Sequence, residues 1–171
     1  MKVSVLTVSD RSSRGEREDI SGPLLGELVK AKGWELSEYG VVSDEQSEIE
    51  TILCEWTDSG EVDLILTTGG TGFSPRDQAP EATLNVVDRV APGIAEAMRS
   101  ASLKITPHAM LSRAVAGIRG QTLIVNLPGS PKAAKENLAI IMPALPHAVQ
   151  LLSDDPGAEA GHEPGPPIKH I

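Results

Sequence analysis

The sequence predicts an α/β fold in which a mostly parallel sheet lies between two layers of helices, an α/β/α sandwich. The first observation is that strand-like segments alternate along the chain with segments whose apolar residues recur at helical spacing. The second is the segment DLILTT, residues 63–68, which is almost entirely apolar, as a strand covered on both faces should be. Alternation of this kind favours parallel strands with crossover helices on both faces of the sheet.

Each predicted element follows from a local pattern. Strands are predicted at 2–9, 35–42, 63–68, 112–118 and 121–127. Helices are predicted at 20–32, 49–59, 80–90, 93–103, 131–142 and 143–152. The second helix has the clearest pattern, because Ile49, Ile52, Leu53 and Trp56 fall on one face and Gly60 ends it.

The composition narrows the classes of function. Apolar residues make up 40% of the 171 residues and aromatic residues only 2%, which disfavours proteins that stack nucleic-acid bases on exposed rings. The net charge of −9 disfavours general binding of DNA or RNA. A local site or a bound metal can still attract a small anion in an acidic protein.

We expect one folded domain over residues 1–152 and a disordered tail over 153–171, which is rich in acidic residues, proline and glycine. Cys54 is the only cysteine, which fits a reducing compartment. The chain shows no secretory signal pattern and no apolar segment long enough to cross a membrane. We therefore expect a cytoplasmic protein with no membrane association and no nucleic-acid partner.

The segment TTGGTG, residues 67–72, directly follows the predicted buried strand. Ligands of open α/β sheets bind beyond the carboxyl ends of the strands. Glycines permit positive φ and let a ligand approach the backbone, whose free N–H groups can then bind an anion. A tight turn without a ligand is the alternative, since this loop matches neither the P-loop nor the dinucleotide-binding pattern.

Two aspartates occupy similar strand-to-helix junctions. Asp77 precedes Pro80, which suits the first position of a helix, and Asp44 follows the second predicted strand. Because parallel strands bring such junctions to one edge of the sheet, the two carboxylates are expected to converge, where they could hold Mg²⁺ beside a phosphate. Taken singly, each could be an acid that stabilises a helix N-terminus, and Ser43 with Gln46 fits a capping box.

Further polar clusters lie at predicted element boundaries. Ser9 and Asp10 follow the first strand, and Ser112 and Arg113 pair a hydroxyl with a guanidinium. In NLPGSPK, Ser130 fits the N-cap of a helix and the following proline fits its first position, so that this helix start could bind a phosphate. Taken singly, these clusters also fit ordinary capped helices and solvated loops.

Five motifs occur in order along the chain: VSDRSSRG, VVSDEQ, LILTTGGTGFSPRDQAPEAT, MLSRAVAGIRGQTLIVNLPGSPKA and HAVQLL. Over roughly residues 2–152 they resemble molybdenum cofactor biosynthesis proteins of the molybdopterin adenylyltransferase type, the Mog/MoaB-like family, which is related to the G domain of gephyrin. The resemblance implies a homotrimer that binds molybdopterin, an anionic pterin with a dithiolene and a phosphate. It also implies that Mg²⁺ and ATP serve to adenylate this phosphate, with release of pyrophosphate, before a separate protein inserts molybdenum.

The resemblance implies roles for individual residues. Asp44 and Asp77 match the essential acids of the active branch, so they are the expected catalytic and metal-binding residues. The expected substrate-binding residues are Ser9, Asp10, Gly69, Gly70, Thr71, Gly72, Ser112, Asn126, Pro128, Gly129 and Ser130. Among them, Ser112 belongs to the pterin side of the site.

One position departs from the active branch, which often has Thr or Ser directly before the proline of RDxxPEAT. This chain has Ala79 there and lacks the hydroxyl. Retention of both aspartates favours an enzyme, and loss of the hydroxyl favours the alternative, a non-catalytic molybdopterin-binding carrier or scaffold. A trimeric interaction protein is the third possibility, as the relationship to gephyrin suggests.

Overall fold

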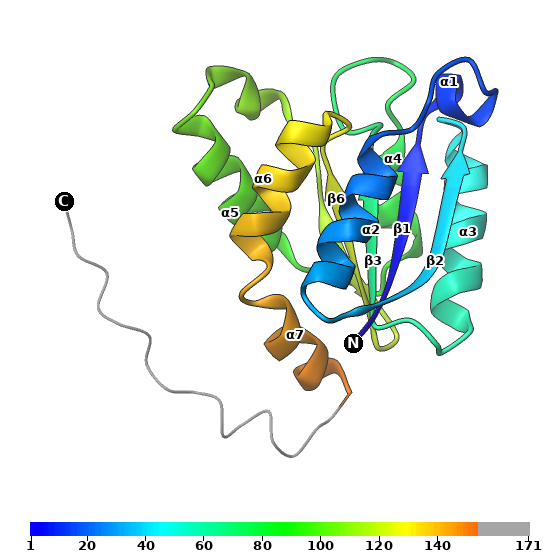
Figure 1. Ribbon diagram of the computed structural model, residues 1–171, viewed down its shortest axis with the longest axis vertical. Helices are drawn as coiled ribbons and strands as arrows, with labels where there is room; N and C mark the ends of the chain where they lie inside the picture. The colour runs from blue at the N-terminus through cyan, green and yellow to red at the C-terminus, as the bar shows by residue number, and fades with distance from the viewer. Residues whose placement is uncertain (154–171) are drawn as a thin grey trace.

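The computed structural model describes residues 1–153, so the predicted tail at 153–171 lies outside the described residues apart from Ser153. A six-stranded sheet carries helices on both faces (Figure 1). The strands are β1 (Lys2–Val8), β2 (Glu35–Val42), β3 (Leu64–Thr68), β4 (Arg89–Val90), β5 (Ala116–Arg119) and β6 (Thr122–Leu127). The helices are α1 (Asp10–Ser13), α2 (Ser21–Ala31), α3 (Gln46–Asp58), α4 (Ala79–Val86), α5 (Pro92–Leu103), the 3₁₀ helix η1 (Pro107–Leu111), α6 (Pro131–Ile141) and α7 (Leu145–Leu152).

The sheet is mostly parallel, as predicted. Its strand order is β2-β1-β3-β6-β5-β4, and β2, β1, β3 and β6 all run in the same direction. β5 is antiparallel to β6, and β4 is antiparallel to β5. The reversal has a local cause, because Arg119 already pairs with Thr122 across a turn in which Gly120 takes a φ of 55°. A parallel pair would need a crossover of a dozen residues or more.

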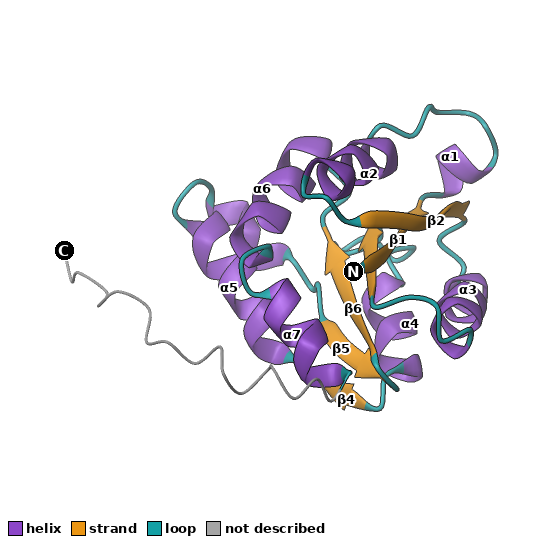
Figure 2. Cartoon of the chain, turned by 60° about the horizontal axis from the view of Figure 1, so that its bottom comes forward, coloured by secondary structure: helices purple, strands orange, loops and turns teal. Residues whose placement is uncertain are grey.

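Figure 2 shows helices on both faces of the sheet, and an aliphatic core lies under each of the two helical layers. α2, α5, α6 and α7 bury Leu25, Met98 and Leu138 and their neighbours against one face. α3 and α4 bury Ile49, Leu53 and their neighbours against the other. The predicted three-layer arrangement is therefore confirmed. No helix among residues 1–153 combines the length and the apolar composition that crossing a bilayer requires.

The strand order creates a crevice at the carboxyl edge of the sheet. The chain passes from β1 to β2 on one side and then crosses to β3 on the other side of β1. The register places Thr7 of β1 beside Thr68 of β3, and Thr68 beside Leu127 of β6, so these strands end together. Ligands of open α/β sheets bind at such a reversal of strand order.

The elements that sequence patterns did not predict are short. α1 lies within a segment predicted as a polar loop, and η1 adds a few residues after α5. The helix predicted at 80–90 is wrong at its end, because α4 stops at Val86 and β4 occupies Arg89–Val90. Elements of two to five residues have too little length for an apolar periodicity, so local hydrogen bonds define them. The strand predicted at 112–118 begins only at Ala116, because the backbone N–H of Arg113 is bonded to Thr71 outside the sheet.

Two helix starts also differ from the predictions. α3 begins at Gln46, and the hydroxyl of Ser43 bonds to Glu48 at 2.6 Å and accepts from the N–H of Glu45, so the predicted capping box is wrong. α4 begins one residue before Pro80. The predicted N-cap position of Ser130, with proline directly after it, is confirmed, although its side chain makes no capping hydrogen bond.

Candidate functional site

A polar pocket of about 430 Å³ opens at the carboxyl edge of the sheet. The loops that follow β1, β2, β3 and β6 all contribute to its wall. It is lined by Thr7, Val8, Ser9, Ser12, Arg17, Glu18, Asp19, Ile20, Ser21, Asp44, Thr68, Gly69, Gly70, Asp77, Gly129, Ser130 and Pro131. The structure therefore brings together both predicted catalytic aspartates and the predicted residues of three different loops.

Each aspartate has one oxygen held by the backbone and one oxygen without a hydrogen bond. Asp44 Oδ2 accepts from the N–H of Asp10 at 2.7 Å, and Asp77 Oδ2 accepts from the N–H of Ser74 at 3.0 Å. The Oδ1 atoms of both carboxylates have no hydrogen-bond partner within residues 1–153. Two oriented carboxylates with one free oxygen each form a donor set that suits a hard cation.

The glycine loop brings its backbone against both carboxylates. Gly69 and Gly70 have φ values of 103° and 61°, a region that favours glycine. A Cβ at Gly70 would lie 3.3 Å from Asp44 Oδ1, and a Cβ at Gly72 would lie 2.9 Å from Asp77 Oδ2. The absence of side chains therefore leaves room beside the two acids, where a ligand or an ion can reach both the loop and the carboxylates.

The pKa values of Asp10 and Asp44 are shifted in opposite directions. The bidentate contact of Arg76 with Asp10, at 2.9 and 3.0 Å, together with the N–H of Asp44, lowers the pKa of the Asp10 carboxyl. Burial raises the pKa of Asp44, and the negative charges of Asp10 and Asp77 raise it further, against the opposing hydrogen bond from the Asp10 N–H. The influence of the Asp77 charge on Asp44 reflects how close together the two acids lie.

The raised pKa of Asp44 predicts that Asp44→Asn does not destabilise the metal-free protein at pH 7. A carboxyl with a raised pKa binds more protons in the folded state, so its contribution to stability falls as pH rises through the interval above its ordinary value of 3.8. The asparagine removes this penalty and can still accept from Asp10. We expect a melting temperature at pH 7 equal to or above that of the wild type, and a difference that shrinks toward pH 4. A melting temperature several degrees lower at pH 7 would contradict the assignment.

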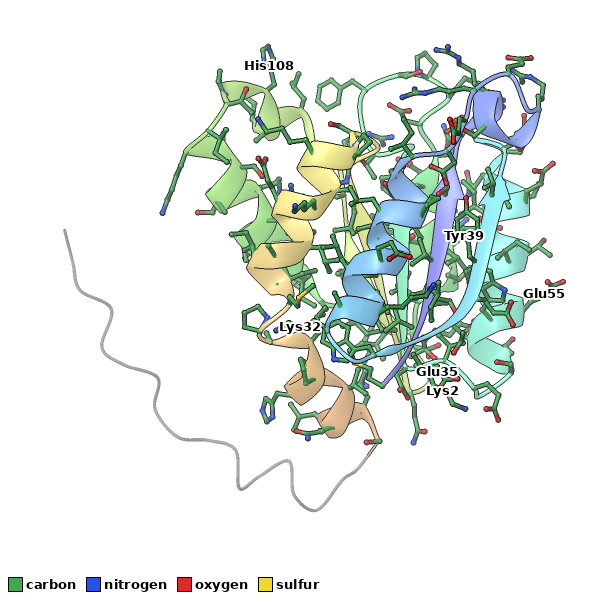
Figure 3. All side chains as sticks on the ribbon, in the orientation of Figure 1. Lys2, Lys32, Glu35, Tyr39, Glu55 and His108 are labelled. Carbon is green, nitrogen blue, oxygen red and sulfur yellow. The ribbon has the colours of Figure 1, made fainter. Side chains whose placement is uncertain are left out.

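A second pocket, of about 300 Å³, lies on the other side of the glycine loop. It is lined by Thr71, Gly72, Arg99, Ser102, Ile105, Thr106, His108, Ala109, Leu111, Ser112, Pro128, Ala133, Glu136 and Asn137. Gly69 and Gly70 thus face the polar pocket, whereas Thr71 and Gly72 face the second one. Figure 3 shows His108 at the same end of the molecule as the strand-end loops, on the η1 side, whereas Lys2 and Glu35 lie at the opposite end.

A family model described as "Probable molybdopterin binding domain" matches residues 4–147, which include every residue of both pockets. The chain belongs to this molybdopterin-binding family. The predicted family resemblance and the predicted fold are therefore confirmed.

Relatives and solved structures within this family cover most of the chain. A molybdopterin adenylyltransferase of Helicobacter pylori is 45% identical over 152 residues, which are 88% of this chain and 86% of that protein. Gephyrin of Dictyostelium discoideum is 48% identical over 90% of this chain, but the chain spans only 23% of gephyrin's length. The crystal structure of the molybdopterin biosynthesis enzyme MoaB from Thermus thermophilus superposes with a TM-score of 0.85 at 50% identity, covering 91% of this chain and 98% of that one.

Two of the residues expected to bind substrate line neither pocket of this family member. Asn126 is fully buried, where its amide donates to Thr67 and Thr83 at 2.9 and 2.8 Å and accepts from the N–H of Val115. These bonds tie β6 to β3 and α4, so its position gives Asn126 a structural role. The Asp10 carboxylate is occupied by Arg76 and the N–H of Asp44, so Asp10 supports Asp44 rather than facing a ligand.

The departure of this chain at Ala79 lies in the core. The Ala79 side chain is fully buried and packs against Gly70, to which its N–H also donates at 3.1 Å. Ala79 itself does not line the polar pocket, but it lies directly behind Gly70, which does.

Sequence reasoning missed Asp19 as part of the pocket wall. Burial alone would raise its pKa, but hydrogen bonds from Thr7, Tyr39, Gly22 and Ser21 lower it below the ordinary value. The shortest of these bonds come from the hydroxyls of Thr7 at 2.6 Å and Tyr39 at 2.7 Å, from two different strands. An acid two residues before a helix was the available signal, and it indicates a helix start rather than a pocket.

Proposed function

We propose that the protein adenylates the phosphate of molybdopterin with Mg-ATP and releases pyrophosphate. A phosphate oxygen of molybdopterin forms a bond to the α-phosphorus of ATP, and the bond between that phosphorus and the bridging oxygen of the β-phosphate breaks. The proposal is carried by one observation: two aspartates, each with one unbonded oxygen, lie against a glycine loop that separates a polar pocket from a second pocket. The high identity to molybdopterin adenylyltransferases supports it.

Asp44 and Asp77 would hold the Mg²⁺. The fit rests on their free Oδ1 atoms and on the open space at Gly70, where a Cβ would lie 3.3 Å from Asp44 Oδ1. Mg²⁺ typically takes one or two protein carboxylates and completes its shell with water and substrate phosphates. When bound, it would supply Lewis acidity that neutralises the charge developing on the transferred phosphoryl group.

The remaining groups of the polar pocket suit the phosphates of a nucleotide. The first N–H groups of α6 have no intrahelical partner, and Ser130 makes no capping bond, so both can face an anion. Arg17 is the one cation that lines this pocket, and it has no ion-pair partner within residues 1–153. We assign the nucleotide to the polar pocket.

We assign the pterin to the second pocket, on the Ser112 side. Thr71, Gly72 and Pro128 also line it. The two ligands would then approach each other across residues 69–72, whose backbone lies between the pockets. In this arrangement the chain positions two phosphate groups and holds the charges around them, which is how enzymes accelerate phosphoryl transfer.

We also propose that the protein acts as a homotrimer in the cytoplasm and delivers its product to a separate molybdenum-inserting protein. These points rest on the family resemblance. Light scattering after gel filtration tests the trimer directly, with an expected mass three times that of the 18.0 kDa chain.

The function is tested by incubating the protein with molybdopterin, ATP and Mg²⁺ and separating the pterins by chromatography. We expect adenylated molybdopterin and an equal amount of pyrophosphate, and neither product when the metal is removed by a chelator. If molybdopterin binds and no adenylate forms with any divalent metal, the non-catalytic carrier becomes the correct function. If molybdopterin does not bind, both interpretations of the site are wrong.

A further inference from the structure

Arg113 holds both ends of the loop that carries Asp77. Its Nε donates to the carbonyl of Gly72 at 2.7 Å, and its Nη2 donates to the carbonyl of Asp77 at 2.5 Å. Its backbone N–H donates to Thr71 at 2.9 Å. One side chain thus fixes the entry and the exit of residues 72–77, and the backbone of the same residue fixes the preceding position.

The Arg113 guanidinium is itself held in place. Its Nη1 pairs with Glu81 of α4, so the side chain connects the loop to a helix that is packed against the sheet. The third nitrogen is therefore also occupied, and Arg113 lines neither pocket. A role in direct ligand binding is thus disfavoured, because the planar fork is already committed to the protein.

Little else within residues 1–153 holds this loop in place. Phe73 is 67% exposed, and Ser74 and Pro75 are exposed as well. The base of the loop is closed by the N–H of Ala79, which donates to the Gly70 carbonyl at 3.1 Å, and the half-exposed side chain of Arg76 reaches Asp10 and Glu45 at the rim. Surface ion pairs are weak, so among side chains from outside the loop the partly buried bonds from Arg113 are the main restraint on its backbone.

We propose that Arg113 is the positioning residue for Asp77, which sets the place of its free carboxylate oxygen relative to Asp44 and thereby the affinity of the site for a divalent cation. This inference rests on the proposed function, because it assumes that the two aspartates hold a metal. Groups that orient metal ligands typically change metal affinity about 10–100-fold when they are replaced.

The test is a double-mutant cycle on metal binding by the protein without substrates. Mn²⁺ replaces Mg²⁺ because free Mn²⁺ is measured directly by electron paramagnetic resonance. Arg113→Lys keeps the charge and loses the fork, and we expect its dissociation constant for Mn²⁺ to rise about tenfold. In an Asp77→Asn background the same substitution should change the constant less than about twofold, because Arg113 acts through the Asp77 carboxylate.

Arg119→Lys is the matched control. Arg119 also joins distant segments, with bonds of 2.9 Å to both Asp58 oxygens and 3.0 Å to the carbonyl of Val86, and its side chain is buried to a similar extent. It lies where β5 turns into β6, at the opposite edge of the sheet from the pockets. We expect it to leave Mn²⁺ affinity unchanged even if it lowers the melting temperature.

The outcomes separate this inference from the proposed function. If Arg113→Lys weakens Mn²⁺ binding equally with and without the Asp77 carboxylate, or no more than Arg119→Lys does, Arg113 is only a structural residue and the inference is wrong. If the wild type forms adenylated molybdopterin but Arg113→Lys leaves its half-saturating Mg²⁺ concentration unchanged, the inference fails and the function stands. If the wild type forms no adenylate and binds no Mn²⁺, the function itself fails.

Should Arg113→Lys fold poorly, Glu81→Gln serves in its place. It keeps the arginine and nearly the same shape, and removes the charge that orients the guanidinium. We expect a smaller rise in the Mn²⁺ dissociation constant, about threefold, which again depends on the Asp77 carboxylate. An unchanged constant in this variant, together with normal stability, would also contradict the proposed role.

Discussion

Asp77→Asn is expected to lower the rate of adenylate formation about 10²- to 10³-fold, the usual cost of removing one preorganised charge-stabilising group. The substitution keeps the size of the side chain and an oxygen that can accept from the Ser74 N–H. It removes the negative charge that faces the glycine loop beside Asp44. The substitution should therefore lower kcat and raise the Mg²⁺ concentration needed for activity, and it should leave the melting temperature nearly unchanged.

Binding of molybdopterin should change little in the same variant. Asp77 lines the polar pocket and not the pocket to which we assign the pterin. We expect the dissociation constant for molybdopterin, measured by fluorescence of the pterin, to change less than about threefold. A substitution can lower kcat without weakening the binding of a substrate, because the two depend on different interactions. A parallel loss of pterin affinity and turnover would show that the two ligands are not divided between the pockets as proposed.

Asp58→Asn is the control for this experiment. The Asp58 carboxylate pairs with Arg119 at 2.9 Å, and Asp58 ends α3 on the edge away from the pockets. Its loss should cost a surface ion pair and leave turnover at the level of the wild type. If both asparagine variants reduce turnover similarly, the effect of Asp77→Asn reflects general destabilisation and not the site.

The parts of the site that sequence could predict lie directly after strands. Asp44, Gly69, Gly70 and Gly129 follow strands of a parallel sheet, and Asp77 lies near the end of the loop between β3 and α4, so the alternation of elements already implies that these residues share one edge. The local sequence is therefore sufficient to predict that these residues lie near one another. The strand-end loops meet as expected because the neighbouring parallel strands β1, β3 and β6 end in register.

The parts that sequence could not predict depend on contacts between residues far apart in the chain. Asp10 has a place beside Asp44, but its carboxylate is taken by Arg76, which is 66 residues away. Asn126 is buried, and its amide donates to the hydroxyl of Thr67 on β3 and to that of Thr83 on α4. No local sequence pattern shows which polar side chains will form hydrogen bonds with distant residues and so be unable to bind a ligand. For the same reason the motif could not reveal that its glycines separate two pockets.

Among alanine substitutions at the glycines of the site, we expect Gly69→Ala to lower the free energy of unfolding the most. Gly69 has a φ of 103°, and a Cβ there would overlap the backbone carbonyl oxygen of Val8. Val8 cannot retreat easily, because it is paired with Val42 in the sheet and almost completely buried. Backbone strain and overpacking each cost about 1–3 kcal/mol, so we expect a loss of about 3 kcal/mol or more.

Gly60→Ala separates the two causes of this loss. Gly60 also has a positive φ, 69°, but a Cβ there would meet no atom within 4 Å. Its substitution should cost only the backbone term, about 1 kcal/mol, or a few degrees in melting temperature for a chain of this size. Equal losses in the two variants would mean that the closeness of Gly69 to Val8 does not matter.

The clash at Gly69 also has a consequence for function, because this residue is where three strand ends meet. Its N–H donates to the Leu127 carbonyl at 3.2 Å, and a Cβ at Gly129 would lie 3.1 Å from its Cα. A side chain at Gly69 must therefore displace the loop from β1, from the residues after β6, or from both. We expect Gly69→Ala to lose nucleotide binding even at temperatures where it is fully folded, whereas Gly60→Ala retains it. Calorimetric titration with Mg-ATP below the unfolding transition checks this, and normal affinity in folded Gly69→Ala would remove the backbone of this loop from the proposed site.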